Sequence, residues 1–441
     1  FISKKQKKSL GMNRQTAALA KHVLVEYYDC NSDKIRDPDF IEKTMIEAAN
    51  TTGIVVSDCV IHSFAPWGVS GAVVMGESHL TIHTWGEFNF ASVDLYTCGE
   101  NADPWQEFNY LAKALESKNY SVMEIKRGIR HLLPPIGELP KEPFKVSERF
   151  SWYHDLDPYG FGVSIQLKDG CLLKKQSKHQ RLEVYNTKKY GKMLLQNGKI
   201  QLTEGSEFIY HEMMVHIPLL THPNPKRVLI VSGGDGGVAR EVLKHESVEK
   251  VVLLELDEAV IETSKKFLPS VSSALDHPKL EILLEDGNHY VKEASEESFD
   301  VIFVDSSDPM GPGVASYDDE FYRNCLRALS ANGILISQSA SPSGSPNEFK
   351  EIYKKYYSLF GKENVHSFFV ETPTYSTGSW TFAFCSKGSV HPTTGLNEKK
   401  AEDFSLRHDL KHYNPDVHKA VFAVPNYVRD VLFGLKSEDI S

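Results

Sequence analysis

The sequence predicts an α/β protein in two parts: a two-layer α/β sandwich, then a small β domain joined to a doubly wound parallel sheet. In residues 22–115, short β-rich runs alternate with amphipathic helical segments. From residue 228 onward, continuous apolar runs alternate with helical patterns, which is typical of parallel strands buried on both faces. A Pro-rich stretch at 132–143 separates the two patterns. A chain of 441 residues also exceeds what one ordinary core accommodates.

The first pattern begins with a β-rich run at 22–28. A helix is expected next, because Asp37 is a good cap and Pro38 suits a first turn. A second helix is expected after Asp103 and Pro104 for the same reason. The strands expected between these two helices are 59–63, 71–75, 78–85 and 91–96. Strands with single covering helices predict a two-layer sandwich.

The second pattern has two sections. Short strands with polar turns are expected at 163–167, 182–184, 192–195 and 199–202, and these predict a small β domain. Longer buried strands are expected at 228–231, 251–256, 280–284 and 301–304. The predicted organisation is a tail at 1–18, a first domain at 19–130, a linker at 131–147, a β domain at 148–210 and a Rossmann-like domain at 211–436.

Composition excludes several function classes. A net charge of −10 argues against a nucleic-acid or anionic-membrane surface, because such partners need clustered Lys and Arg. No run approaches the roughly 18 apolar residues of a membrane span, and the first residues lack a signal-peptide layout. The six cysteines are scattered without a C-x-x-C pair, which predicts neither a zinc site nor a disulfide framework. We therefore expect a cytoplasmic protein without a metal.

Residues 76–85 form an unusual strand, with two histidines, a serine and a glutamate between apolar neighbours. Taken alone, such a segment is most often an amphipathic strand with one polar face. A metal site from His79 and His83 is disfavoured, because residues four apart in a strand lie about 13 Å from each other.

Five ordered blocks around this strand resemble the bacterial-type S-adenosylmethionine decarboxylase over residues 19–128. They read Gly-Val-Ser-Gly, Glu-Ser-His, His-Thr-Trp followed by Glu87, Asp-Leu-Tyr-Thr-Cys-Gly, and Glu-Ile-Lys-Arg-Gly. The blocks start at Gly68, Glu77, His83, Asp94 and Glu124. One departure is Gly86, where the family usually has Pro.

The resemblance implies self-cleavage and a pyruvoyl cofactor. Ser78 attacks the carbonyl of Glu77, and the new chain that starts at position 78 carries the pyruvoyl group. That group forms a Schiff base with the substrate amine and accepts electrons as carbon dioxide leaves. By the same resemblance, His83 assists self-cleavage, Cys98 reprotonates the carbon, and Ser70 supplies a hydroxyl near the pyruvoyl. Ser78 and His83 fall on opposite faces of a strand, so their meeting requires a bend or the strand end that cleavage creates.

A Gly-rich turn follows the strand at 228–231. Residues 234–239 satisfy the pattern G-x-G-x-x-G/A, and Glu255 ends the next strand about 20 residues later. Glycines allow close backbone approach and the carboxylate can hold ribose hydroxyls, so a nucleoside pocket is predicted. Asp235 within the turn would repel a pyrophosphate, which favours an adenosyl sulfonium ligand over a dinucleotide.

Acidic residues follow the third and fourth strands of this domain. Asp286 and Gly287 occupy the position expected to meet adenine. Asp305 and Asp308 lie where ligands bind in open α/β sheets, at the carboxyl end of a strand. Carboxylates there suit a cationic amine, because they bind ammonium and accept a proton as the amine attacks. The alternative is a turn that Asp and Ser merely cap.

This stretch resembles spermidine synthase, and the resemblance extends over residues 148–436. It also rests on the segments 207–210, 222–225, 372–375 and 412–418. The resemblance implies that Asp305 is the general base and that methylthioadenosine leaves from the carbon beside the sulfonium. The residues implied to hold decarboxylated S-adenosylmethionine are Gln180, Asp235, Glu255, Asp286 and Gly287. Those implied to line the amine channel are Tyr210, Asp308 and Tyr375, with Gln201 shaping the site.

Two departures from the family pattern fall near the expected amine site. His211 stands where Gln is common, and Ala340 stands where Glu is usual. Loss of a carboxylate should weaken or redirect capture of a distal ammonium. Putrescine is therefore the expected acceptor, and a related amine is the alternative.

Together the two resemblances predict a bifunctional enzyme of polyamine biosynthesis, in which the first reaction makes the aminopropyl donor that the second consumes. The expected substrates are S-adenosylmethionine, its decarboxylated form and an amine, and a dimer or larger homo-oligomer is expected. Three alternatives stay open. The first half could decarboxylate another amino acid, such as arginine or ornithine. The second half could be a methyltransferase, or one half could be non-catalytic.

Overall fold

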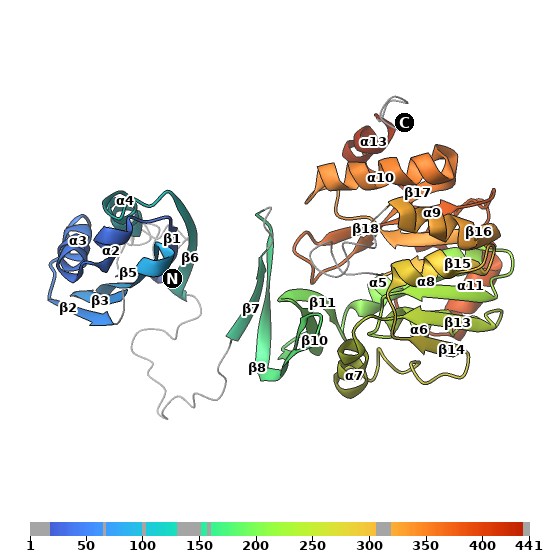
Figure 1. The fold of residues 1–441 in the computed structure, drawn as a ribbon, viewed down its shortest axis with the longest axis horizontal. Coiled ribbons are helices and arrows are strands. Elements are labelled where there is room, and N and C mark those ends of the chain that lie inside the picture. The colour runs from blue at the N-terminus through green and yellow to red at the C-terminus, as the bar shows by residue number, and fades with distance from the viewer. Residues whose placement is uncertain are drawn as a thin grey trace, which may run out of the picture. The chain divides into compact units, whose positions relative to one another are not determined.

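The computed structural model describes residues 18–64, 68–98, 103–129, 151–156, 160–305 and 319–434. The chain divides into two compact units, Phe1–Lys145 and Val146–Ser441 (Figure 1). Residues 1–17 of the predicted tail and the whole predicted linker, 131–147, lie outside the described residues. Among the described residues, no helix is long and apolar enough to cross a membrane.

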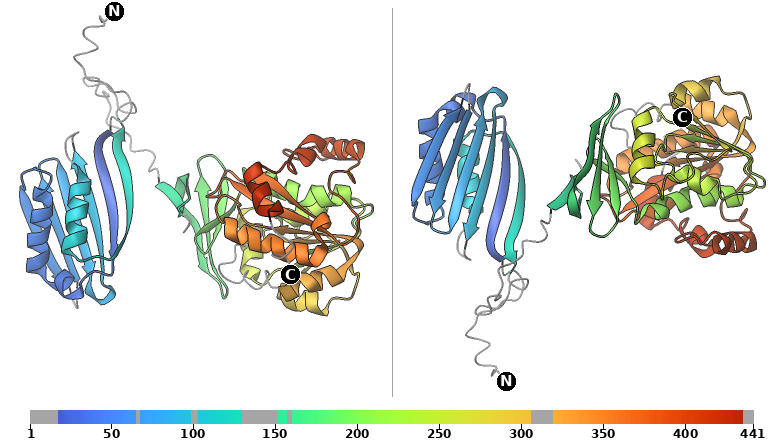
Figure 2. Two further views of the ribbon diagram at one scale, coloured as in Figure 1. Left: turned by 90° about the horizontal axis from the view of Figure 1, so that it is seen from above. Right: turned by 90° about the horizontal axis from the view of Figure 1, so that it is seen from below.

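The first unit is a six-stranded antiparallel sheet in the order β2-β3-β4-β5-β1-β6. Its strands are β1 (Ala18–Tyr28), β2 (Asp58–Phe64), β3 (Gly68–Met75), β4 (Ser78–Trp85), β5 (Phe90–Cys98) and β6 (Asn119–Ile129). Helices α2 (Ser32–Arg36), α3 (Pro38–Asn50) and α4 (Pro104–Ala114) cover one face (Figure 2), and a short 3-10 turn, η1 (Gly86–Phe88), follows β4. This confirms the predicted two-layer sandwich, to which β6 and α2 are additions.

Side-chain caps explain where the covering helices begin. The Asp37 side chain accepts hydrogen bonds from two backbone amides at the start of α3, and Pro38 occupies the first position. At the start of α4, Asp103 accepts one such hydrogen bond, from the Trp105 amide, and Pro104 occupies the first position. Alternation along β4 then sorts its side chains: Ser78, Leu80, Ile82 and Thr84 are buried against the helices, while the residues between them are more exposed.

The β domain of the second unit is a five-stranded antiparallel sheet in the order β11-β10-β9-β8-β7. Its strands are β7 (Ser151–Leu156), β8 (Gly162–Gln176), β9 (Arg181–Thr187), β10 (Lys192–Gln196) and β11 (Lys199–Thr203). β7 is an addition to the predicted strands, and β8 is much longer than predicted. Its register against β9 shifts between Leu167 and Leu173, which interrupts the alternation of buried and exposed residues on which the prediction depended.

The larger domain contains a seven-stranded sheet in the order β14-β13-β12-β15-β16-β18-β17. Its strands are β12 (Arg227–Val231), β13 (Lys250–Leu254), β14 (Leu280–Leu283), β15 (Phe299–Val304), β16 (Leu329–Gln338), β17 (Val365–Glu371) and β18 (Ser379–Ser386). The first five in chain order are parallel, which confirms the predicted doubly wound sheet, and β18 runs antiparallel to both of its neighbours. The chain reverses its direction of travel across the sheet between β12 and β15, and ligands bind at such switch points.

Helices pack around this sheet (Figures 1 and 2). They are α5 (Glu207–Thr221), α6 (Gly237–Val242), α7 (Glu258–Phe267), α8 (Gly287–Glu293), α9 (Asp319–Ala328), α10 (Pro346–Phe360), α11 (Glu398–Arg407), α12 (Pro415–Ala420) and α13 (Asn426–Phe433). A 3-10 turn, η4 (Lys362–Asn364), precedes β17. Because α5 begins at Glu207, the predicted division at 210/211 falls within its first turns.

Candidate active sites

The Glu77–Ser78 peptide bond lies at the end of a tight hairpin. Gly76 and Glu77 form a two-residue turn between β3 and β4, and Met75 pairs with Ser78 across it. Gly76 has a φ of 55°, a conformation that glycine adopts at little cost. Glu77 is exposed, whereas Ser78 is only 3% exposed. The bond therefore joins an exposed turn residue to a buried strand residue.

Cys98, at the end of β5, contacts both sides of this bond. Its backbone N–H donates to the Ser78 hydroxyl at 3.0 Å, and its thiol donates to the Glu77 carbonyl oxygen at 3.1 Å. Burial, with a smaller contribution from the Glu77 carboxylate, raises the pKa of the Cys98 thiol. The thiol is therefore protonated at neutral pH and is able to donate.

Ser70 and His83 form a second pair within the same sheet. They lie opposite each other on β3 and β4, and the Ser70 hydroxyl is 2.8 Å from His83 Nδ1. His83 is about 17 Å along the strand from Ser78 and projects from the other face of the sheet. The structure thus groups Glu77, Ser78 and Cys98, and separately Ser70 and His83, without joining the two groups. The assistance of His83 in self-cleavage stays a prediction.

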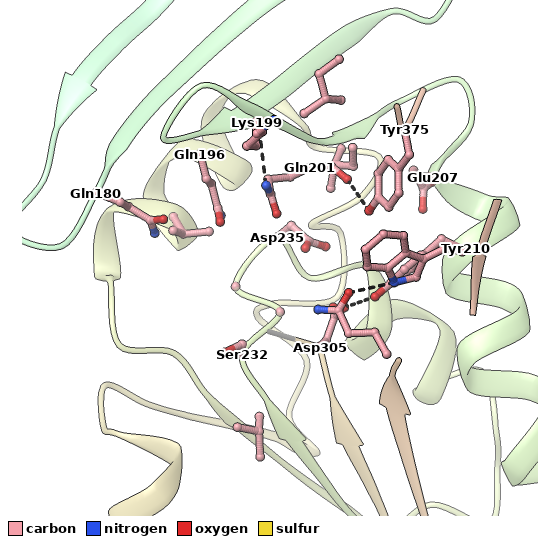
Figure 3. Close-up of a pocket in the computed structure, with 18 of the residues that line it drawn as sticks. Gln180, Gln196, Lys199, Gln201, Glu207, Tyr210, Ser232, Asp235, Asp305 and Tyr375 are labelled. Atoms are coloured by element: carbon pink, nitrogen blue, oxygen red, sulfur yellow. Dashed lines mark hydrogen bonds between the residues drawn. The ribbon is translucent and has the colours of Figure 1, made fainter. Parts of the chain in front are cut away.

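A cavity of about 470 Å³ lies at the carboxyl ends of the strands around the switch point in the larger domain (Figure 3). Ten predicted residues line it: Gln180, Gln201, Tyr210, His211, Asp235, Glu255, Asp286, Gly287, Asp305 and Tyr375. Asp308 lies outside the described residues. Segments that are distant in sequence thus meet at one site.

The Gly-rich turn and the second strand form one side of the cavity. Glu255 accepts hydrogen bonds from the backbone amides of Gly234 and Asp257, at 3.0 and 2.9 Å. A side chain at position 234 would collide with the Glu255 carboxylate, so this turn requires glycine. Burial raises the pKa of Glu255 to about 7. Gln180 reaches the same corner, where its side-chain amide donates to Asp257 at 3.1 Å.

Asp286 and Gly287 begin α8 beside this corner. Asp286 caps the helix by accepting from the Asn288 amide at 2.7 Å. A Cβ at position 287 would lie 2.5 Å from Val231, so glycine allows α8 to approach β12 closely.

Asp305 and two tyrosines form another side of the cavity. Tyr210 donates its hydroxyl to Asp305 at 2.7 Å, and Tyr375 donates to the Gln201 carbonyl at 3.0 Å (Figure 3). Burial raises the pKa of Asp305 to about 7. The neighbouring Asp235 adds to this shift, and His211 opposes it. A carboxylate with this pKa can both accept and release a proton near neutral pH.

His211 supplies positive charge among these acids. Its Nδ1 is 2.5 Å from Glu207 and its Nε2 is 3.6 Å from Asp235. Burial disfavours the charged ring, but the bond to Glu207 and the charge of Asp235 outweigh burial and raise the pKa of His211 to about 9. Arg240 binds the same Glu207 through both terminal nitrogens, at 2.9 and 2.8 Å. The imidazolium is therefore held in place and offsets the charges of Asp235 and Asp305.

Three family models match the chain. The spermine/spermidine synthase domain matches residues 207–397, the spermidine synthase tetramerisation domain matches 151–204, and S-adenosylmethionine decarboxylase matches 21–128. A polyamine aminopropyltransferase of Thermoanaerobacter sp. (strain X514) is 41% identical over 283 residues, which span 64% of this chain and 98% of the relative. A Bacillus subtilis (strain 168) polyamine aminopropyltransferase is 37% identical over 281 residues, 64% of this chain and 98% of that relative.

The chain belongs to the polyamine aminopropyltransferase family.

Solved structures agree with this membership. A spermidine synthase in complex with the transition state analogue AdoDATO superposes with a TM-score of 0.61 at 35% identity, covering 68% of this chain and 100% of that one. The Thermotoga maritima spermidine synthase superposes with a TM-score of 0.59 at 36% identity, covering 65% and 95%. Ahead of its aminopropyltransferase part, the same chain carries a match to S-adenosylmethionine decarboxylase. The predicted fusion of two enzymes of polyamine biosynthesis is thereby confirmed.

His211, Asp235 and Asp305 of the aminopropyltransferase place possible metal-ligand atoms within 4.8 Å of one another. The raised pKa of His211 keeps its ring protonated, and a protonated ring has no lone pair for a metal. That favours an ion-pair network over a metal site. The absence of a metal stays a prediction.

Several residues of the aminopropyltransferase site are not predicted by the sequence. Asp257 binds Gln180, and its position just after a strand is a signal that could have indicated it. Arg240 acts through Glu207, and Trp380 donates to Gln338 at 3.1 Å. Those two contacts join distant segments, and no local pattern indicates them.

Proposed function

We propose that the chain decarboxylates S-adenosylmethionine and then transfers the aminopropyl group of the product to putrescine or a related amine. The products of the second step would be spermidine, or its analogue, and methylthioadenosine. One observation carries the proposal: the predicted adenosyl-binding residues and the Tyr210–Asp305 pair line one cavity at the switch point.

We propose that the first half activates itself at Glu77–Ser78. The Ser78 hydroxyl attacks the Glu77 carbonyl carbon, the peptide C–N bond breaks, and the proton moves to nitrogen, which leaves an ester. Loss of the Ser78 α-proton then releases the Glu77 carboxylate. Hydrolysis by water expels ammonia and leaves a pyruvoyl group at position 78. The Cys98 contacts support this order, because the thiol hydrogen bond would stabilise negative charge on the attacked carbonyl.

The residues present fit such a group, since Cys98 lies against both Ser78 and Glu77. When formed, a pyruvoyl group supplies a carbonyl that accepts electrons during decarboxylation. Cys98, protonated and next to position 78, would deliver a proton to the carbon that loses carbon dioxide.

Intact mass spectrometry under denaturing conditions tests self-cleavage. The expected result is one fragment ending at Glu77 and another starting at position 78, with the mass of an N-terminal pyruvoyl. An uncut chain would contradict the first half of the proposal. Assays of carbon dioxide release from S-adenosylmethionine, arginine and ornithine would then identify the substrate.

In the second half, the amine attacks the carbon beside the sulfonium. The new C–N bond forms as the C–S bond breaks, and the amine proton passes to Asp305. Tyr210 orients Asp305 through its hydroxyl. The ionised form of Asp305 is a base suited to neutral pH. Asp235 would bind the cationic aminopropyl donor. The positive charge of His211 would reduce the repulsion between Asp235 and Asp305.

Asp305→Asn tests this assignment. We expect kcat for methylthioadenosine formation to fall about 10²- to 10⁴-fold, because the amide cannot accept the proton. Glu285→Gln, at the cavity's adenosyl side, is the control and should lower activity far less. Production of S-adenosylhomocysteine in place of methylthioadenosine would identify a methyltransferase instead.

We also propose that the chain self-associates through its β domain. Residues 151–204 match the spermidine synthase tetramerisation domain, and the side chains of Trp152 and Leu156 on edge strand β7 are 51% and 57% exposed. Apolar side chains of this size on an open edge suit a partner surface.

A further inference from the structure

We propose that Glu348 binds the distal ammonium of the acceptor and so makes the enzyme select α,ω-diamines over monoamines. This inference rests on the proposed aminopropyl transfer and concerns the part of the cavity lining that precedes and begins α10. No residue of the predicted site is assigned that task within the described residues.

Two segments, 338–348 and 372–380, supply one part of the cavity lining, which we call the arm. The arm is polar but almost uncharged: its walls include Gln338, Ser341, Ser345, Thr377 and Trp380. Among the described residues that line this arm, Glu348 alone carries a charge. A cation bound against the arm would have this carboxylate as its counter-charge.

Local structure fixes where Glu348 lies. The turn before α10 is closed by the Ser345 amide, which donates to the Ser341 carbonyl at 2.8 Å, and by a 3.1 Å contact between the Ser341 and Ser343 hydroxyls. The first turn of α10 then places Glu348 beside Phe349, which is fully buried against the sheet. Glu348 itself is half-buried and lines the cavity.

The Glu348 carboxylate has no hydrogen-bond or ion-pair partner within the part of the chain that the structure describes. Ser345 and Glu348 have the spacing of a capping box, in which the carboxylate would accept from the Ser345 amide. That amide already donates to Ser341. The carboxylate therefore remains free for a ligand.

The charge of a diamine acceptor requires a carboxylate in this part of the cavity. One amine of a diamine must be neutral to attack, while the other stays protonated, since such amines titrate near 10. Enclosing an ammonium without a counter-charge is costly. The family resemblance leads us to expect a distal carboxylate at position 340, but Ala340 stands there, and its carbonyl accepts from Thr381 at 2.6 Å. Glu348 provides the missing charge from the next helix.

Steady-state kinetics of the full chain and of Glu348→Gln test the proposal, with putrescine and n-butylamine as paired probes. We expect KM for putrescine to rise about 10- to 100-fold, as a charged hydrogen bond is replaced by a neutral one. The kcat/KM for n-butylamine and the KM for decarboxylated S-adenosylmethionine should stay unchanged, and the latter also reports correct folding. Glu351→Gln is the matched control, because Glu351 lies on the same helix, outside the cavity, and pairs with Lys354 at 3.0 Å.

Two results would overturn the proposal. If Glu348→Gln leaves KM for putrescine unchanged while the unmodified enzyme releases methylthioadenosine, Glu348 is not the distal site and the transfer itself stands. If the variant lowers kcat/KM equally for putrescine and n-butylamine, Glu348 shapes the cavity without binding the second ammonium. Failure of the unmodified enzyme to release methylthioadenosine with any amine would instead remove the proposed function, and this inference with it.

Discussion

Asp305 and His211 shift each other's pKa in the aminopropyltransferase site. Asp305, the proposed base, can accept a proton only when ionised, so with its raised pKa of about 7 we expect kcat/KM to fall as the pH drops through that value. His211 lowers this pKa and Asp235 raises it. The acid limb of the pH profile therefore reports the balance between two neighbours.

Substituting those neighbours should move the acid limb in opposite directions. His211→Asn removes a positive charge, so we expect the limb to shift upward by up to about 1 pH unit. Asp235→Asn removes a negative charge and should shift it downward. The measurement is log kcat/KM against pH for both variants with one amine, whose own titration then cancels. Equal shifts of the same sign would contradict the charge argument.

The role proposed for Cys98 in self-cleavage can be tested through its two hydrogen bonds. Cys98→Ala removes the thiol donor to the Glu77 carbonyl, and we expect cleavage to slow about 10²-fold, as for loss of one oxyanion donor. Cys98→Ser keeps a donor and should retain more activity. The cleaved fraction is followed by mass spectrometry over time, with Cys59→Ala as the control. Unchanged cleavage in Cys98→Ala would assign the thiol to decarboxylation alone.

At the scale of single elements, α4 contains a buried acid that lowers the stability of the first unit when it ionises. Glu107 is fully buried under the sheet, and neither carboxylate oxygen has a hydrogen-bond partner among the described residues. Burial raises its pKa from 4.5 to about 8. The folded unit therefore holds a proton that the unfolded chain releases at neutral pH.

The sign of the resulting pH dependence follows from that difference. The contribution of Glu107 to stability is greatest below about pH 4.5, falls as the pH rises towards 8, and is level above it. The loss is at most about 5 kcal/mol. Glu107→Gln should remove this slope between pH 5 and 8, whereas Glu42→Gln, at an exposed position of α3, should keep it. Hydrogen exchange of residues 18–129 at increasing urea concentrations measures it, and an unchanged slope in Glu107→Gln would show that Glu107 ionises without cost.

The elements that sequence predicts well are those with local causes. Asp37 and Asp103 cap their helices directly, and β12 and β15 are apolar because both faces are covered. β7, the bulge in β8 and the antiparallel pair β17–β18 depend on tertiary pairing, so sequence periodicity does not indicate them. The same division holds in the sites. Motif residues are found from sequence, but the role of Arg240 behind Glu207 depends on two helices that meet only in the fold.

At the scale of the whole molecule, we predict self-association through β7. Light scattering after gel filtration should give a mass above that of one chain. Trp152→Asp with Leu156→Asp should lower it, because charged residues on the open edge disfavour burial there. Leu406→Asp, at a more exposed apolar position on α11, should leave the mass unchanged. A monomeric unmodified chain would contradict the prediction.

The strand order of the first unit has a further consequence if the hairpin at Glu77 is cut. β1 would then belong to the shorter fragment and yet remain paired between β5 and β6 of the longer one. β3 of the shorter fragment would likewise stay paired with β4 of the longer one. The two fragments would share one sheet, and separating them would require breaking three strand pairings together: β1–β5, β1–β6 and β3–β4. A denatured, cut enzyme could therefore reassemble only by a bimolecular encounter, at a rate set by concentration, whereas the uncut precursor folds as a single chain.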